Sequence, residues 1–148
     1  TTLWEGQSTT AANLSITAIP GYNGFHPRKG YFNVGYRFML GGVTIYHAGD
    51  TDAVPELAQV GPVDVAMLPI GGVFVMDEAE AAKAVDMLKA ATVIPMHYGF
   101  ATGGDPARFA QAVGDKAKGI VLDPGISGGM PAPVRLLVKL MGGRRKKW

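Results

Sequence analysis

The sequence predicts an α/β protein in which a mixed β-sheet carries helices on one of its faces. Short apolar runs typical of buried strands recur at 43–47, 63–70 and 91–96. The last two runs are separated by a segment whose apolar residues repeat at helical spacing. After residue 63 the order is strand, helix, strand, helix, strand, which is typical of parallel or mixed pairing with helices packed on one face.

Two hairpins are expected before these elements. A turn at 5–8 and a strand at 13–19 form the first, because apolar and polar residues alternate along that strand. The second joins strands at 31–40 and 43–47 around Gly41-Gly42. One face of its first strand is formed by Phe32, Val34, Tyr36, Phe38 and Leu40.

The central elements follow from the same patterns. Residues 63–70 are too continuously apolar for a half-exposed strand, so we expect a central strand covered on both faces. Asp77 and Glu80 have the spacing of a capping box, which predicts the start of a helix. The apolar stripe of this helix is Ala81, Ala84, Val85 and Leu88. A strand at 91–96 follows it.

A second helix is predicted over 106–113, with Asp105 as its cap and Pro106 at its first position. Its inward-facing residues are expected to be Phe109, Ala110 and Val113. A last strand at 119–122 should end the domain before a turn at Pro124-Gly125.

Two of the strand runs end in side chains that can bind a metal ion. Asp50 follows the run at 43–47, and His97 follows the run at 91–96. Ligand sites in open sheets collect at strand ends, so these two side chains are expected to lie close together. Gly49 lets the backbone bend, which would turn the Asp50 carboxylate into the site. The alternative is two core strands followed by polar turns, with Asp50 or Thr51 capping a short helix that begins at Pro55.

The motifs in residues 3–125 resemble the later half of the metallo-β-lactamase superfamily. The segments that carry this resemblance are 46–51 (YHAGDT), 64–72 (DVAMLPIGG), Met76, Glu78-Ala79 and 94–99 (IPMHYG). They look like the branch of bacterial and archaeal metal-dependent hydrolases that includes relatives of the L-ascorbate 6-phosphate lactonases. The resemblance implies that residues 1–125 form one half of an αββα sandwich.

The resemblance also implies roles for individual residues. Asp50 would be a metal ligand, bridging two ions where two are bound, and His97 would be a second ligand, so that both are catalytic. His26 is a third candidate ligand. In the related hydrolases, a Pro-x-Tyr-Asn segment followed by His-Pro-Lys lies beside the active site. The residues expected to contact the substrate or to support the ligands are Tyr22, Asn23, His26, His47, Thr51 and Tyr98.

The chain departs from the family pattern in its first half. The family's His-x-His-x-Asp-His cluster is absent, and the three histidines are His26, His47 and His97. The chain also opens without methionine, at a point that corresponds to the middle of the family fold. Three explanations stay open: the first half was removed, another polypeptide supplies it, or a half-fold works differently. Because half a sandwich exposes an apolar sheet face, we expect a homodimer or a complex with a chain supplying the missing half.

A complete site would perform metal-assisted hydrolysis of a small-molecule ester, lactone or phosphoester. Zinc, as one or two ions, is the expected cofactor for imidazole and carboxylate donors, although manganese, iron and nickel accept the same donors. A catalytic zinc site usually has three protein ligands, whereas Asp50 and His97 are two. The competing hypothesis is therefore a non-catalytic half-domain that acts as a structural or interaction subunit.

Composition narrows the setting of this site. The chain has no cysteine, which excludes disulfides and thiolate ligands and suits a cytoplasmic protein. No apolar run approaches the roughly 20 residues of a membrane span, and the start lacks a signal-peptide pattern. Of the fourteen basic residues, eight precede position 123, whereas all twelve acidic residues lie at or before Asp123. Residues 1–123 therefore carry about −4 and should not bind nucleic acid.

The remaining six basic residues lie in the segment 126–148, which is expected to be a linker and a basic apolar tail. Basic residues interleaved with apolar ones suit contact with an anionic membrane surface or an acidic partner. The alternative is that this tail folds back onto the acidic body of the chain.

Overall fold

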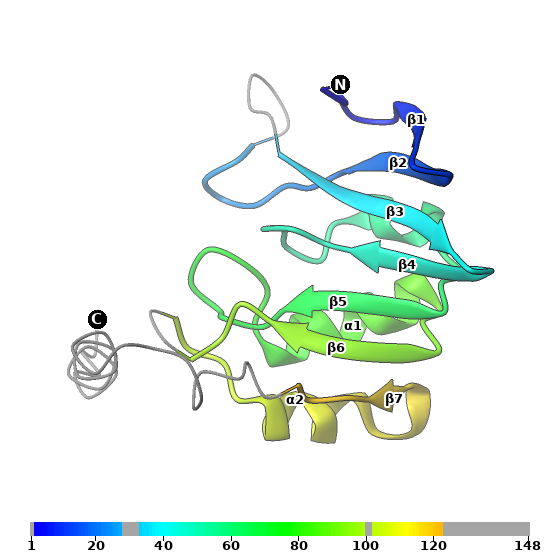
Figure 1. Ribbon diagram of the computed structural model, residues 1–148. Coiled ribbons are helices and arrows are strands. Elements are labelled where there is room, and N and C mark those ends of the chain that lie inside the picture. Colours follow the sequence, from blue (N-terminus) through cyan, green and yellow to red (C-terminus); the bar gives the residue numbers. More distant parts are fainter. Residues whose placement is uncertain (1, 28–32, 100–101, 123–148) are drawn as a thin grey trace, which may run out of the picture.

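The computed structural model describes residues 2–27, 33–99 and 102–122, which form a seven-stranded sheet with helices (Figure 1). The strands lie side by side in chain order, from β1 to β7. Their bounds are β1 Ser8–Ala11, β2 Leu14–Pro20, β3 Val34–Leu40, β4 Val43–His47, β5 Val65–Pro69, β6 Thr92–Met96 and β7 Lys118–Gly119. The helices are η1 Pro55–Gln59, α1 Glu78–Leu88, α2 Pro106–Val113 and η2 Gly114–Lys116.

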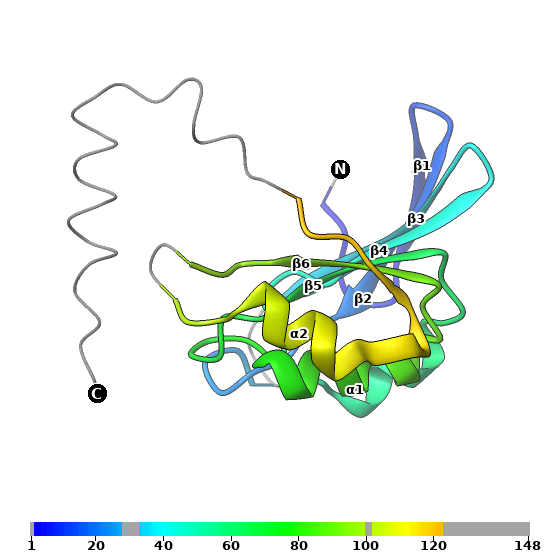
Figure 2. The same ribbon diagram turned by 90° about the horizontal axis from the view of Figure 1, so that it is seen from below.

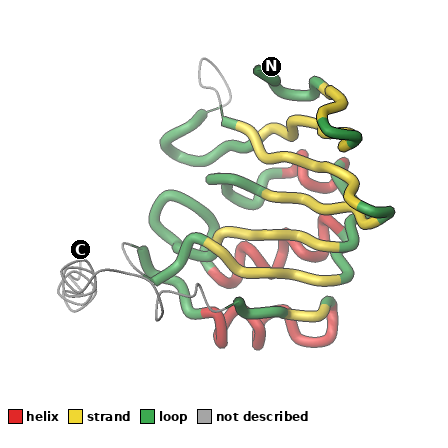
Figure 3. Tube along the Cα trace, viewed as in Figure 1, coloured by secondary structure: helices red, strands yellow, loops and turns green. Residues whose placement is uncertain are grey.

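The sheet is mixed, with an antiparallel half and a parallel half. β1 to β4 pair antiparallel through two hairpins, whereas β4, β5, β6 and β7 pair parallel. The helices lie in the connections between the parallel strands (Figure 3). This is the mixed α/β sheet that the sequence predicts.

The helices cover one face of the sheet (Figure 2). Tyr46, Ala66 and Val93 are Cα partners across β4, β5 and β6, and all three are fully buried on this face. Leu57 of η1, Leu88 of α1 and other buried residues of these helices belong to the same core cluster. The core therefore lies between the sheet and its single layer of helices.

The other face of the sheet is apolar and only partly buried. Tyr36, His47, Met67 and Ile94 form one row of Cα partners across β3 to β6, on the side opposite to Tyr46 and Ala66. Tyr36 is exposed, and His47, Met67 and Ile94 are half-buried. In the described part of the chain, no helix packs on this face (Figure 2). We call it the open face, and it differs from the expectation of a central strand covered on both sides.

The capping predictions are confirmed for both long helices. Asp77 accepts a hydrogen bond from the backbone N–H of Glu80, and the Glu80 carboxylate accepts one from the N–H of Asp77. Asp105 caps α2 through the N–H groups of Ala107 and Arg108. The predicted turn at Gly41-Gly42 is also present, with both glycines at positive φ.

Three local predictions are wrong. The predicted turn near Glu5-Gly6 is present, but the first hairpin turns at Ala12-Asn13, both at positive φ, and the strand β1 lies between the two turns. Ala110 of α2 is exposed, because α2 lies at the sheet edge and β7 has only two residues. The predicted strand at 119–122 is shorter and begins one residue earlier, as β7 over Lys118–Gly119.

Some expectations fall outside the described residues. The residues concerned are Phe32 and the whole segment 126–148, for which a linker and a tail are predicted. Within the described residues, no helix has the length and apolar character that crossing a membrane requires.

Candidate metal centre

Three parallel strands deliver three connecting segments to one edge of the sheet. Because β4, β5 and β6 run in the same direction, their carboxyl ends meet at this edge. Asp50 follows β4, the loop 70–77 follows β5, and His97 follows β6 directly. Although 47 positions separate them in the sequence, Asp50 and His97 are thus only two strands apart.

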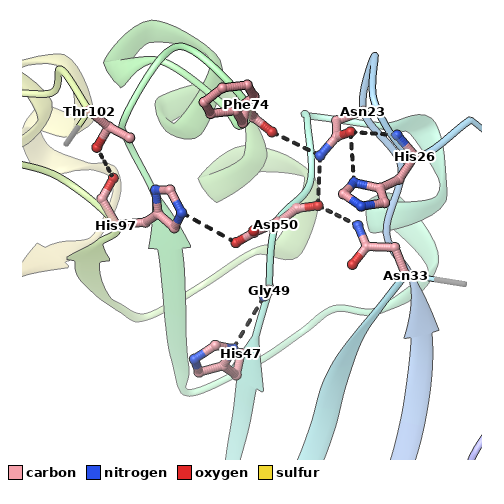
Figure 4. Close-up of polar contacts among 9 residues, drawn as sticks. All are labelled: Asn23, His26, Asn33, His47, Gly49, Asp50, Phe74, His97 and Thr102. Atoms are coloured by element: carbon pink, nitrogen blue, oxygen red, sulfur yellow. Dashed lines mark hydrogen bonds and ion pairs between the residues drawn. The ribbon is translucent and has the colours of Figure 1, made fainter.

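The side chains of Asp50 and His97 point toward one another across this edge (Figure 4). The Nε2 atom of His97 lies 3.6 Å from the Oδ1 atom of Asp50. The side chain of His97 is 35% exposed and that of Asp50 is 49% exposed, so both side chains are open to solvent. The structure therefore offers one carboxylate and one imidazole at a single open position.

His97 adopts a backbone conformation that is rare for a residue with a side chain. Its φ is +53°, in the left-handed region that favours glycine. The hydroxyl of Thr102 donates a 3.1 Å hydrogen bond to the carbonyl oxygen of His97 and holds this turn. Non-glycine residues in strained conformations collect at functional sites, and here the left-handed turn directs the imidazole toward Asp50.

The backbone of Asp50 is fixed from the opposite direction. Gly49, with φ of +65°, bends the chain after β4. The carbonyl oxygen of Asp50 then accepts hydrogen bonds from two asparagine side chains, from Asn23 Nδ2 at 3.0 Å and from Asn33 Nδ2. In Figure 4 this carbonyl points toward the asparagines and the carboxylate toward His97.

Asn23 uses its whole hydrogen-bonding capacity within the protein. Its Nδ2 atom donates to Asp50 O at 3.0 Å and to Phe74 O at 2.8 Å. Its Oδ1 atom accepts from the backbone N–H groups of Phe25 and His26, at 2.9 and 2.8 Å. With both amide hydrogens and both lone pairs engaged and only 8% of its surface exposed, Asn23 supports the site and has no capacity left for a substrate.

The other two histidines lie apart from the Asp50–His97 pair. His26 is held against Asn23, with its Nδ1 atom 3.1 Å from Asn23 Oδ1. His47 lies on the open face and its Nδ1 atom accepts a 3.2 Å hydrogen bond from the N–H of Gly49. Neither ring points into the gap between Asp50 and His97 (Figure 4).

Tyr22, Thr51 and Tyr98 have contacts that tie the surrounding loops together. Thr51 is fully buried, and its hydroxyl accepts from the N–H of Tyr22 at 3.0 Å and lies within 3.1 Å of the carbonyl oxygens of Tyr22 and Asp52. The Tyr22 hydroxyl donates to Glu5 at 2.6 Å. Tyr98 is partly buried against the core. The N-cap residue of η1 is Val54, and no side chain caps this helix, so neither Asp50 nor Thr51 is its cap.

The carboxyl of Asp52, two residues after Asp50, has a raised pKa. Burial is the larger cause, and the negative charge of Glu80 raises the pKa further.

Several residues of the site carry no signal in the sequence. Asn33 reaches Asp50 only because β3 returns beside β4, and Thr102 reaches His97 only because the chain turns back after β6. Phe25 and Phe74 form an edge-to-face pair with ring centroids 4.7 Å apart, and both are exposed beside the Asn23 loop. An aligned set of relatives is the kind of signal that could mark these positions.

The two donors fit part of a metal site. Two ligands at about 2.0–2.2 Å from one tetrahedral ion lie roughly 3.3–3.5 Å apart, close to the 3.6 Å between His97 Nε2 and Asp50 Oδ1. Among the described residues, no group of three or more His, Cys, Asp or Glu side chains is arranged to hold a metal. The described part of the chain thus brings together two possible donors, fewer than the three protein ligands of an ordinary catalytic zinc site.

The fold is a mixed α/β sheet with a carboxylate and an imidazole at the carboxyl ends of two parallel strands, β4 and β6. Comparison with known proteins identifies the family to which this chain belongs. The sequence model described as "Beta-lactamase superfamily domain" matches residues 1–97. A UPF0173 metal-dependent hydrolase from Pyrococcus furiosus is 52% identical over 129 residues, which cover 80% of this chain and 56% of that relative. The corresponding relative from Thermococcus kodakarensis is 44% identical over 127 residues, 79% of this chain and 56% of that relative.

Solved structures agree with this assignment. Igni18, described as a metallo hydrolase from Ignicoccus hospitalis, matches with a TM-score of 0.72 and 32% identity, over 82% of this chain and 56% of that one. A Thermotoga maritima protein of the metallo-β-lactamase superfamily matches with a TM-score of 0.65 at 20% identity, over 80% of this chain and 70% of that one, a likeness of fold alone. The chain belongs to the metallo-β-lactamase superfamily. It spans about half the length of the curated relatives it matches.

Proposed function

We propose that this chain is the part of a metal-dependent hydrolase that contributes Asp50 and His97 to the metal centre, and that a further segment or chain completes the centre. The observation that carries the proposal is the 3.6 Å approach of His97 Nε2 and Asp50 Oδ1 at accessible strand ends. The names of the relatives, which are metal-dependent hydrolases, support the same reaction class.

When bound, a metal ion such as zinc would lower the pKa of a water molecule and polarise the substrate for hydrolysis of an ester, lactone or phosphoester. Zinc suits a carboxylate and an imidazole, and manganese, iron or nickel accept the same donors. The residues of this chain hold the two donors in place. Asp50 presents its carboxylate from the bent turn after β4, and His97 presents Nε2 from its left-handed turn after β6.

The open face supports the proposal of a completing partner. Met67 and Ile94 lie at the centre of this face, where an apolar surface exposed to water is unfavourable. A second sheet packed here would bury them and would bring its own ligands to the same edge. We propose that this sheet comes from another segment, from another chain, or from a second copy in a homodimer. A cytoplasmic location agrees with the absence of cysteine from the sequence.

The second candidate is a non-catalytic half-domain that binds a partner through the open face. The observation in its favour is that the described residues include only two aligned donors, fewer than the three of an ordinary catalytic zinc site. The two candidates differ in whether Asp50 and His97 bind a metal ion.

Calorimetric titration of the purified chain with Zn²⁺ separates the two candidates. We expect Zn²⁺ binding that is lost in the Asp50→Ala plus His97→Ala variant. The matched control is Asp86→Ala, which removes an exposed carboxylate paired with Lys116 on the helical side. Binding that is equal in the double variant and the wild type would contradict the proposed metal centre.

A further inference from the structure

The carbonyl oxygen of Asp50 is the meeting point of two asparagine side chains from different parts of the sequence. Asn23 lies in the loop after β2, and Asn33 lies immediately before β3. Both Nδ2 atoms donate to the same Asp50 oxygen (Figure 4). Two side-chain amides on one backbone carbonyl exceed what a turn needs for its own stability, since one donor already satisfies a buried carbonyl.

From this convergence we propose that Asn23 and Asn33 are positioning residues that form an asparagine clamp on Asp50. The clamp fixes the peptide plane that follows Asp50, so that the carboxylate on the other side of the Cα atom faces His97. This inference rests on the proposed function, since it assigns the clamp a role in metal binding. Neither asparagine touches the gap between Asp50 and His97, so each acts on the metal site by holding Asp50.

The surroundings show why the clamp is rigid. Asn23 is buried and also bonds Phe74 O, Phe25 N and His26 N, which ties the loop after β2 to the loop after β5. The backbone of Asn33 accepts a 3.1 Å hydrogen bond from Gly21 N, which fixes Asn33 beside the same loop. Both donors are therefore anchored independently of Asp50, as preorganised support requires.

Gly21 lies directly against this arrangement. A Cβ atom at this position would lie 3.4 Å from Asn33 Nδ2 and 3.5 Å from Thr51 Cβ, which is ordinary van der Waals contact. Thr51 follows Asp50 and is held by hydrogen bonds to the backbone of Tyr22. The segment 21–23 thus holds Asp50 and the residue after it.

The test compares Asn23→Ala, Asn33→Ala and the double variant in the full chain. In calorimetric titration with Zn²⁺, each single variant is expected to weaken affinity by roughly tenfold, the lower end of the effect of removing groups that support metal ligands. Because both amides act on one carbonyl, the double variant should lose little more than either single variant. The control is Val113→Ala in α2, which removes buried apolar volume on the helical side and should leave Zn²⁺ affinity unchanged.

A second readout needs no metal. The N–H of Asp52 donates to Tyr22 O, and the N–H of Met76 donates to Thr51 O, so both amides report on the Asp50 turn. By NMR, hydrogen exchange at these two amides should accelerate at least tenfold relative to the amide of Thr92 in both asparagine variants. The same ratio should stay unchanged in Val113→Ala.

The outcomes separate the clamp from the proposed function. Unchanged Zn²⁺ affinity in both asparagine variants, with binding that still depends on Asp50, overturns the clamp and leaves the proposed function standing. If the wild-type chain and its Asp50→Ala variant show the same absence of Zn²⁺ binding, the proposed function fails, and the role of the clamp in metal binding fails with it. Exchange at Asp52 and Met76 that is no faster than in Val113→Ala also overturns the clamp.

Discussion

Replacing Gly71 by alanine should displace His97 through a direct steric contact. A Cβ atom at this buried glycine would lie 2.6 Å from the His97 carbonyl oxygen, 2.8 Å from Thr102 Oγ1 and 2.9 Å from Thr102 Cβ. Non-bonded heavy atoms pack best at about 3.5–4.0 Å, so the turn containing His97 must move by roughly 1 Å. That movement disturbs both the Thr102 hydrogen bond and the position of the imidazole.

The expected loss of stability follows from this overpacking. Overfilling a packed interior costs about 1–3 kcal/mol. For a chain of this length, such a loss lowers Tm by roughly 3–12 °C, which differential scanning calorimetry can measure. Zn²⁺ affinity should fall by roughly tenfold as well, because His97 and Asp50 lose their spacing.

Gly24→Ala is the matched control for this prediction. Gly24 lies in the loop after β2, its φ is compatible with alanine, and an added Cβ would meet no atom within 4 Å. Its substitution should change the free energy of unfolding by less than about 0.5 kcal/mol. A Gly71→Ala protein with wild-type Tm and wild-type Zn²⁺ affinity would refute the argument that the 71–102 contact positions His97.

Three further predictions concern the core, a nearby carboxyl and the open face. Tyr46→Phe should raise the free energy of unfolding, measured by denaturant titration, by about 1 kcal/mol. The buried Tyr46 hydroxyl has no hydrogen-bond partner within the described residues, and burial raises its pKa. A loss of stability in this variant would contradict the prediction. Asp52→Asn should raise Tm at pH 7 but not at a pH well below the ordinary pKa of aspartic acid. Because the pKa of Asp52 is raised in the folded protein, this carboxyl lowers the stability of the fold as pH rises through that pKa. An equal effect on Tm at both pH values would count against this prediction. Ile94→Glu on the open face should leave the isolated chain folded, as measured by circular dichroism. The same substitution should abolish association with the completing part, as measured by sedimentation velocity. Association that persists in this variant would argue against docking on the open face.

The parts of the structure that depend on local sequence could be predicted. The capping box of Asp77 and Glu80 and the cap at Asp105 involve neighbours in the chain, and both were expected. The alternation of strands and helices after residue 63 likewise fixed the parallel half of the sheet. The juxtaposition of Asp50 and His97 followed from parallel strands sharing one edge, together with the family resemblance.

The remaining features depend on tertiary structure or on unusual backbone angles. Ala12 and Asn13 turn the first hairpin at positive φ without any glycine, and Asn13 is the only one of the two whose residue type favours turns, so the composition signal is weak. Ala110 has the helical spacing of a buried residue but lies at a sheet edge that β7 barely covers. Asn33 and Thr102 act on backbone carbonyls brought near by folding, which residue type and spacing do not encode.

The central claim is that this chain supplies Asp50 and His97 to a metal centre that a further segment or chain completes. Its most direct test is Zn²⁺ titration of the chain before and after mixing with the remaining part of the Pyrococcus furiosus relative, the part outside its match to this chain. The account predicts that mixing strengthens Zn²⁺ affinity and that Asp50→Ala plus His97→Ala abolishes this gain, while Asp86→Ala preserves it. A complex that binds Zn²⁺ equally well without Asp50 and His97 would contradict the account.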